Sequence, residues 1–365
     1  MGRQGFIRYC AALLLLCGCA WAQTWSFAVS GDSRNCGDIV MPSIAAGASQ
    51  NGAAFYWHLG DFRAMYAIDE DIGGGKTPAD LKAYREMAWG DFELHELGPF
   101  AGLPLFLARG NHEEAGGQTR AQYVAEFSSW LDQPVIREQR LRDDSTDTSP
   151  HSYYHWIQGG IDFIAMDNGS GVDFEPVQLA WFEKVLDRAS RNADVKTLVV
   201  GMHRALPDSL SAGHSMNDTP EGTTSGRKAY ADLLAFRKNS GKKVYVLASH
   251  SHFVMSDLYN TACRREHPDE ILPGWLIGTA GAVRYRLPPD HSAAKTAKTD
   301  VYGYLIGTVS PDGAVTFDFK QVDEDQLTPQ VKQRYSKDLI HFCFSANRSE
   351  SVVEGPAPPP NCPPE

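Results

Sequence analysis

The sequence lacks several features that would place it in common classes of protein. None of its 365 residues belongs to an apolar run long enough to cross a bilayer, which takes about 20 residues. Basic residues are outnumbered, 34 Lys and Arg to 45 Asp and Glu, and form no basic run. We therefore expect neither a nucleic-acid polymer nor an anionic membrane as a partner. The absence of a C-x-x-C pair argues against a cysteine-rich zinc site.

The sequence also shows no internal repeat and no linker-like stretch in its middle. Its length is compatible with two domains, but we expect one large domain with insertions. The hydrophobic content of 42% is sufficient for a large core.

The N-terminal end has the pattern of a secretory signal peptide. Arg3 and Arg8 precede a short apolar run at residues 11–16, and residues 20–22 form an A-x-A cleavage site. We therefore expect residues 1–22 to be removed and the protein to be extracytoplasmic, either periplasmic or secreted.

Two further predictions concern the ends of the chain. The segment before the A-x-A site resembles an imperfect lipoprotein box, so a lipoprotein acylated at Cys19 is the alternative to cleavage after residue 22. Residues 346–365 are rich in proline, which is typical of a segment outside a packed core. We predict a C-terminal tail there, and a single folded domain over residues 23–345.

The cysteines agree with export. Removal of the leader leaves Cys36, Cys263, Cys343 and Cys362, and an even number in an exported protein predicts two disulfides. Three connectivities are possible. We favour Cys343 with Cys362, which are close in sequence, and hence Cys36 with Cys263.

The middle of the chain alternates apolar strands with amphipathic helices, which predicts an α/β fold. Strands are expected at residues 25–30, 54–59, 103–108, 196–200, 244–248, 275–279, 302–309 and 315–319, with a hairpin at 152–158 and 161–166. Helices are expected at residues 42–51, 80–97, 118–131, 177–189, 227–238 and 327–337. Residues 69–77 and 208–225 are rich in glycine and polar residues, which predicts surface loops.

Polar side chains follow five of the predicted strands. In open α/β sheets, ligands bind at the carboxyl ends of the strands, so we expect these side chains to meet. A mixed set of oxygen and nitrogen donors suits zinc, manganese or iron better than calcium or magnesium. The residues are Asp32, Asp61, Asn111 with His112, His203, and His250 with His252.

The order of these motifs resembles that of the calcineurin-like metallophosphoesterases, which include the purple acid phosphatases. The motifs read GD, GDF, GNHE, GMH and SHSH, and they span residues 32–252. The resemblance implies a four-layer αββα sandwich with two divalent or trivalent transition metal ions (Mn, Fe or Zn) at the strand ends. It also implies that a metal-bound hydroxide attacks the phosphorus of a small phosphorylated substrate.

The resemblance also implies a role for each residue. Asp61 would bridge both ions, and His112 would act as general acid or contact the transition state. Asp32 and His252 would hold the first ion. The second ion would be held by Asn111, His203 and His250.

The sequence departs from the family pattern at two places. Ser249 replaces the glycine of the usual Gly-His-x-His motif. Arg34 replaces the histidine of the usual Asp-x-His motif, and a guanidinium cannot be a metal ligand because it stays protonated. Purple acid phosphatases have a tyrosine three residues after the second aspartate, where this chain has Ala64. Water, substrate or Tyr66, two residues further on, would have to complete the first site.

We therefore interpret Arg34 as a phosphate clamp, because guanidinium binds phosphate through two parallel hydrogen bonds. The alternative is a salt bridge to a nearby carboxylate. The clamp predicts a phosphoesterase that prefers monoesters to diesters. A second hypothesis is a degenerate family member that binds a phosphorylated ligand without turnover. The sequence leaves the substrate and the oligomeric state open.

Overall fold

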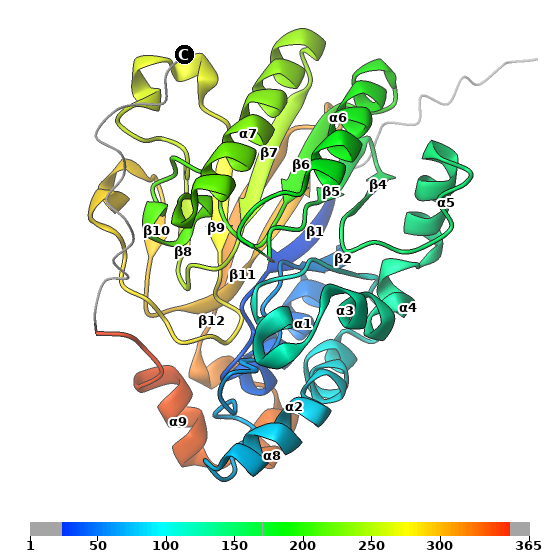
Figure 1. The fold of residues 1–365 in the computed structure, drawn as a ribbon. Coiled ribbons are helices and arrows are strands. Elements are labelled where there is room, and N and C mark those ends of the chain that lie inside the picture. The colour runs from blue at the N-terminus through cyan, green and yellow to red at the C-terminus, as the bar shows by residue number, and fades with distance from the viewer. Residues whose placement is uncertain (1–23, 170, 351–365) are drawn as a thin grey trace, which may run out of the picture.

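A computed structural model describes residues 24–169 and 171–350 and arranges them in four layers, two β-sheets between two layers of helices (Figure 1). The predicted leader at residues 1–22, Cys19, Cys362 and most of the predicted tail lie outside the described residues.

The first sheet has five strands in the order β12-β11-β1-β2-β3. Strands β1, β2 and β3 are parallel, and β11 pairs with β1 in the antiparallel direction. The strands are β1 (Trp25–Ser30), β2 (Ala53–His58), β3 (Leu105–Leu107), β11 (Tyr302–Val309) and β12 (Val315–Val322).

The second sheet has seven strands in the order β10-β8-β9-β7-β6-β5-β4. Strands β5, β6, β7 and β9 are parallel. The strands are β4 (Tyr154–Gln158), β5 (Ile161–Ala165), β6 (Thr197–Gly201), β7 (Lys243–Ala248), β8 (Val254–Ser256), β9 (Gly274–Ile277) and β10 (Ala297–Lys298).

The alternation of side chains along the strands separates the layers. Successive residues of a strand point to opposite faces, so in β1 Phe27 and Val29 join the core between the two sheets, whereas Ala28 faces the outer helices. In β2, Trp57 likewise faces the inter-sheet core and Tyr56 the helices. These separate cores confirm the predicted αββα sandwich.

The helices cover the outer faces of both sheets. In Figure 1, α6 (Pro176–Arg191) and α7 (Pro220–Ser240) lie side by side over the second sheet, and their apolar residues share a core with β5, β6 and β7. The first sheet is covered by α1 (Gly37–Gln50), α8 (Pro329–Arg334) and α9 (Lys337–Ser345). The remaining helices are α2 (Pro78–Phe92), α3 (Arg120–Glu126), α4 (Ser128–Leu131) and α5 (Pro134–Asp143).

Several element boundaries differ from the sequence prediction. Helix α7 begins at Pro220, inside the predicted loop 208–225, because Thr219 accepts a hydrogen bond from the Gly222 amide and proline is favoured at the first helical position. The predicted helix 118–131 is divided into α3 and α4 at Phe127. Helices α5 and α9 and strands β8 and β10 were not predicted.

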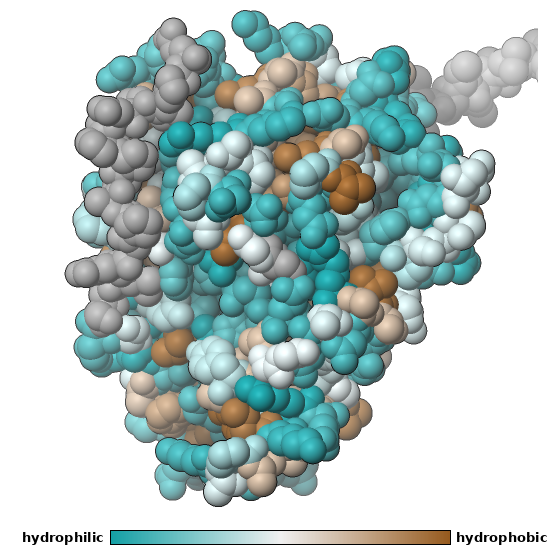
Figure 2. Space-filling model, in the orientation of Figure 1, coloured by the Kyte–Doolittle hydropathy of each residue, from teal (hydrophilic) through white to brown (hydrophobic). Residues whose placement is uncertain are grey.

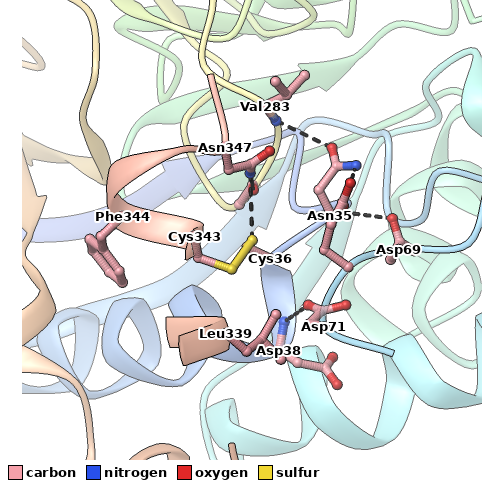
Figure 3. The surroundings of a disulfide bond; sticks show 12 residues. Asn35, Cys36, Asp38, Asp69, Asp71, Val283, Leu339, Cys343, Phe344 and Asn347 are labelled. Atoms are coloured by element: carbon pink, nitrogen blue, oxygen red, sulfur yellow. Dashed lines mark hydrogen bonds between the residues drawn. A yellow bond between two sulfur atoms is a disulfide. The ribbon is translucent and has the colours of Figure 1, made fainter. Parts of the chain in front are cut away.

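The disulfide between Cys36 and Cys343 contradicts the favoured pairing (Figure 3). It joins the residue before α1 to the last turns of α9, 307 residues along the chain, with Cα atoms 6.0 Å apart. Cys263 is also disulfide-bonded. Beyond α9, Asn347 is buried, and its amide donates to Cys36 Sγ over 3.5 Å, so chain packing continues into the first residues of the predicted tail.

The surface is mainly polar on the face shown in Figure 2, where apolar residues form scattered patches. Among residues 24–169 and 171–350, no helix has both the length and the apolar character needed to cross a membrane.

Candidate metal centre

The polar groups that follow the five strands meet at one place. Asp32, Asp61, His203 and His250 each offer a ligand atom within 4.8 Å of the others, and all four are buried. The two remaining predicted ligands lie against this group. Asn111 Oδ1 is 3.1 Å from His203 Nε2, and His252 Nε2 is 3.1 Å from Asp32 Oδ1.

The backbone at the strand ends is held in unusual conformations. Asp32, Asp61 and His250 have φ angles of 59°, 60° and 69°, in the left-handed region that costs about 1–3 kcal/mol for a residue other than glycine. The close approach explains Gly110 of the GNHE motif, because a Cβ there would lie 2.2 Å from Asp61 Oδ1. Such strain concentrates at functional sites.

Glu113 braces two of these loops and was given no role by the sequence analysis. Its carboxylate accepts hydrogen bonds from the amides of Asp61, Phe62 and Gly110 at 2.9, 2.8 and 2.6 Å. Burial, together with the nearby Asp61 carboxylate, raises the pKa of Glu113 to about 7. The position of Glu113 in the GNHE motif is the signal that could have identified it.

One side of the centre, which we call the His203 pocket, is formed by Asp61 Oδ1, Asn111, His203 and His250. His203 Nδ1 donates to the carbonyl of Leu59 over 2.9 Å, so the neutral ring presents the lone pair of Nε2 to the pocket. That atom lies 3.2 Å from Asp61 Oδ1 and 2.9 Å from His250 Nδ1. Electron-rich atoms that face one another in a buried pocket are stabilised by a cation placed between them.

The other side, the Arg34 pocket, is formed by Asp32 Oδ1, Asp61 Oδ2, His252 Nε2 and the Arg34 guanidinium. Asp61 therefore directs one oxygen to each pocket. Arg34 Nη2 is 3.3 Å from His252 Nε2, and Arg34 Nε is 4.0 Å from Asp61 Oδ2. Neither Arg34 Nε nor Asp61 Oδ2 has a hydrogen-bond partner among the described residues.

Ser249 holds Asp32 in place. Its hydroxyl donates to Asp32 Oδ2, and the backbone amide of His250 donates to the same oxygen over 2.7 Å. The family's glycine could not make the first of these bonds. The replacement therefore adds a donor to Asp32 and leaves Asp32 Oδ1 directed at His252.

His112 lies at the edge of the centre. Its Nδ1 donates to the carbonyl of Ala64 over 2.6 Å, so a proton for transfer would be carried by Nε2, which is 3.6 Å from Asp61 Oδ2. Burial lowers the pKa of His112, although Asp61 opposes that shift. A lowered pKa makes the imidazolium a stronger acid and also reduces the fraction of His112 that is protonated near neutral pH.

Three aromatic rings line the centre. Tyr66 is 57% exposed, and its ring centroid is 5.0 Å from that of His112. Tyr66 Oη accepts from Arg34, so it contacts the arginine, not the carboxylates. Tyr285 stacks on His252 at 4.0 Å between centroids, and His214 lies 4.6 Å from His250. The sequence analysis did not identify Tyr285 or His214, because neither follows one of the five strands.

The charged groups of the centre shift one another's pKa values. Burial alone would raise the pKa of Asp61, but the neighbouring His112 and His203 hold it well below its ordinary value. Burial, with Arg204 nearby, holds the pKa of His250 well below its ordinary value. Burial would lower the pKa of His203 as well, but Asp61 raises it. Ionised Asp61 and neutral His250 are thus in the protonation states that metal binding requires, whereas a metal ion would have to displace a proton from His203.

The two pockets differ in how well they fit a metal ion. The His203 pocket contains oxygen and nitrogen acceptors with no positive side chain among them, which suits a transition metal ion. In the Arg34 pocket, a guanidinium already contacts the nitrogen that would bind an ion. Metal binding is therefore supported for the His203 pocket, and the Arg34 pocket does not fit an ion.

No protein-family model matches the sequence, and no curated protein matches it significantly. Solved structures do. The structure titled "Structure of PhoD" is 12% identical, with a TM-score of 0.52, over 82% of this chain and 72% of that chain. This chain has the fold of the calcineurin-like metallophosphoesterases. Identity this low shows the fold alone, so it confirms the expected architecture and leaves the activity to the site.

Two other solved structures are similar at lower TM-scores. One is GAP50, titled the anchor in the inner membrane complex of Plasmodium, with 13% identity, a TM-score of 0.48, and coverage of 94% of this chain and 99% of that chain. The other is a metallophosphoesterase from Sphaerobacter thermophilus, with 13% identity, a TM-score of 0.31, and coverage of 89% and 100%.

Proposed function

We propose that this protein is an exported metal-dependent phosphoesterase that hydrolyses a small phosphate ester, with monoesters preferred to diesters. The observation that carries the proposal is the meeting of Asp61, Asn111, His203 and His250 beside a buried arginine and a histidine with a free ring nitrogen. A metallophosphoesterase fold supports hydrolysis of phosphoric esters as the general class of reaction.

The side chains of the centre would have different roles in the reaction. When bound at the His203 pocket, an ion of manganese, iron or zinc would supply positive charge to phosphate oxygens and lower the pKa of the attacking water. Arg34 holds its guanidinium beside the pocket and offers an unpartnered Nε–H to a phosphate oxygen. His112 would donate a proton from Nε2 to the leaving oxygen. The family resemblance implies two ions, whereas the side chains present favour one, in the His203 pocket.

The monoester preference follows from Arg34. A guanidinium binds two oxygens of one phosphate in parallel, and a monoester has more free oxygens for this than a diester has. Export is supported by the disulfide between Cys36 and Cys343, since such bonds persist in oxidising compartments. The net charge of −11 supports a small substrate over a nucleic-acid polymer.

The departure at Arg34 also favours a second candidate, a protein that binds a phosphorylated ligand without turnover. One experiment separates the two functions. Purified protein loaded with Mn²⁺ is assayed with an aryl phosphate monoester and the matching diester, with Asp61→Asn as the inactive control. We expect faster monoester turnover that a chelator abolishes. Phosphate binding without turnover of either ester would instead support the second candidate.

A further inference from the structure

The guanidinium of Arg34 stands where a first metal ion would have to bind. Such an ion would use Asp32 Oδ1, Asp61 Oδ2 and His252 Nε2, the acceptors of the Arg34 pocket. Arg34 Nη2 lies 3.3 Å from His252 Nε2, and Arg34 Nε lies 4.0 Å from Asp61 Oδ2. The arginine therefore faces two of the three acceptors.

The tautomer of His252 shows what Arg34 contacts. His252 Nδ1 lies 2.6 Å from the carbonyl oxygen of Val283. A carbonyl oxygen only accepts hydrogen bonds, so Nδ1 carries the proton and Nε2 carries a lone pair. An arginine N–H only donates, so Arg34 Nη2 donates to that lone pair. The same Nε2 lies 3.1 Å from Asp32 Oδ1, so the guanidinium already supplies the positive charge beside two acceptors that a metal ion would otherwise bind.

The guanidinium is held from several sides. Arg34 Nη1 donates to the hydroxyl of Tyr66 over 3.1 Å and to Asn35 Oδ1 over 3.4 Å. Nη2 also donates to the hydroxyl of Tyr285 over 3.4 Å. Arg34 is 3% exposed, so moving it aside would break these bonds inside the protein.

The loop that carries Arg34 is anchored as well. The amide of Asn35 donates to Asp69 Oδ1 over 2.6 Å, and the next residue, Cys36, forms the disulfide to Cys343 (Figure 3). Asn35 Oδ1 also accepts from the amide of Val283 over 3.2 Å. The position of the arginine is thus part of the fold.

We propose that the Arg34 guanidinium permanently replaces the first metal ion, so that the centre binds a single ion, in the His203 pocket. The fixed charge lies 4.0 Å from Asp61 Oδ2 and offsets part of the negative charge of this pocket, and a metal cation placed there would meet a like charge. The inference deepens the proposed function, on which it rests: phosphate would bind between one ion and one arginine, with the unpartnered Nε–H as a donor.

Metal stoichiometry tests the inference. The full-length protein is saturated with Mn²⁺, dialysed, and its metal content is measured by inductively coupled plasma mass spectrometry. We expect one equivalent for the parent protein and for Arg34→Lys, the matched control that keeps the charge. We expect two for Arg34→His, which restores a neutral nitrogen ligand. Electron paramagnetic resonance should show an isolated Mn²⁺ in the parent and a coupled pair in the histidine variant.

Three results would overturn the inference: two ions in the parent protein, two in Arg34→Lys, or one in Arg34→His. If circular dichroism shows that Arg34→His does not fold, Arg34→Gln replaces it as a neutral variant. One ion in that variant at saturating Mn²⁺ would count against the idea that the charge of Arg34 excludes the second ion. The ion count is independent of the ester assay. One bound ion without turnover would leave this inference standing and reject the enzymatic function.

Discussion

Replacement of His112 by alanine is the sharpest test of the proposed chemistry. The Ala64 carbonyl accepts a hydrogen bond from His112 Nδ1, and His112 Nε2 lies 3.6 Å from Asp61 Oδ2, so the protein fixes the orientation of the ring. His112 is not one of the four grouped ligands. Loss of a positioned general acid lowers turnover by about two to four orders of magnitude, or roughly 3 to 5 kcal/mol of transition-state stabilisation. The metal content should not change.

Leaving groups distinguish a proton donor from other roles of His112. The phenolate of an aryl phosphate is a good leaving group and departs without a proton. The alkoxide of an alkyl phosphate is a poor leaving group and needs a proton to depart. Turnover of the His112→Ala variant should therefore fall much more for the alkyl ester. His341→Ala, at an exposed histidine remote from the centre (side chain 72% exposed), is the matched control and should match the parent. Equal losses for both esters would refute the general-acid role, and loss of bound metal would show that His112 is a ligand.

Three predictions concern stability. Burial would lower the pKa of His155, but its flanking carboxylates raise it to about 9. The protonated ring should therefore stabilise the folded protein by roughly 3 kcal/mol at pH values below the ordinary pKa near 6.5. This stabilisation should disappear as the pH rises through about 9. Urea unfolding across this window should show the loss, and His155→Asn should remove it; an unchanged pH slope in the variant would contradict the assignment. The double variant Cys36→Ala, Cys343→Ala should lose about 2–5 kcal/mol, measured by the same unfolding assay, and two free thiols at these positions in the native protein would disprove the bond. Arg63 is fully buried among carboxylates, so Arg63→Met should lower the free energy of unfolding by about 3–5 kcal/mol. Arg137→Met, at a half-exposed ion pair, is the control and should lower it by at most about 1 kcal/mol. Equal losses in the two variants would contradict the predicted effect of burial.

The sequence was sufficient to predict which residues lie at the strand ends. An apolar strand followed by a polar residue is a local pattern, and parallel strands bring their carboxyl ends to one edge. Asp32, Asp61 and His203 follow from that pattern alone, and the structure places them together.

Local patterns failed where the decisive contacts are distant or polar. Helix α5 buries only Ile136 and Gln139, so it has almost no apolar periodicity to detect. The preference for Cys343 with Cys362 assumed that closeness in sequence decides pairing. Helix α9 instead packs against α1 and places Cys343 beside Cys36, 307 residues away.

The sequence by itself determined the donor atoms of this centre and the exchange of a histidine for Arg34. It left open whether Arg34 would clamp a phosphate or pair with a carboxylate. Only the tertiary structure placed Nη2 on the lone pair of His252, a residue 218 positions away. The physical reason is that a lone pair has a direction, set here by the carbonyl that accepts a hydrogen bond from the other ring nitrogen. That carbonyl belongs to Val283, which is brought to the site by the fold and by no pattern in the neighbouring sequence.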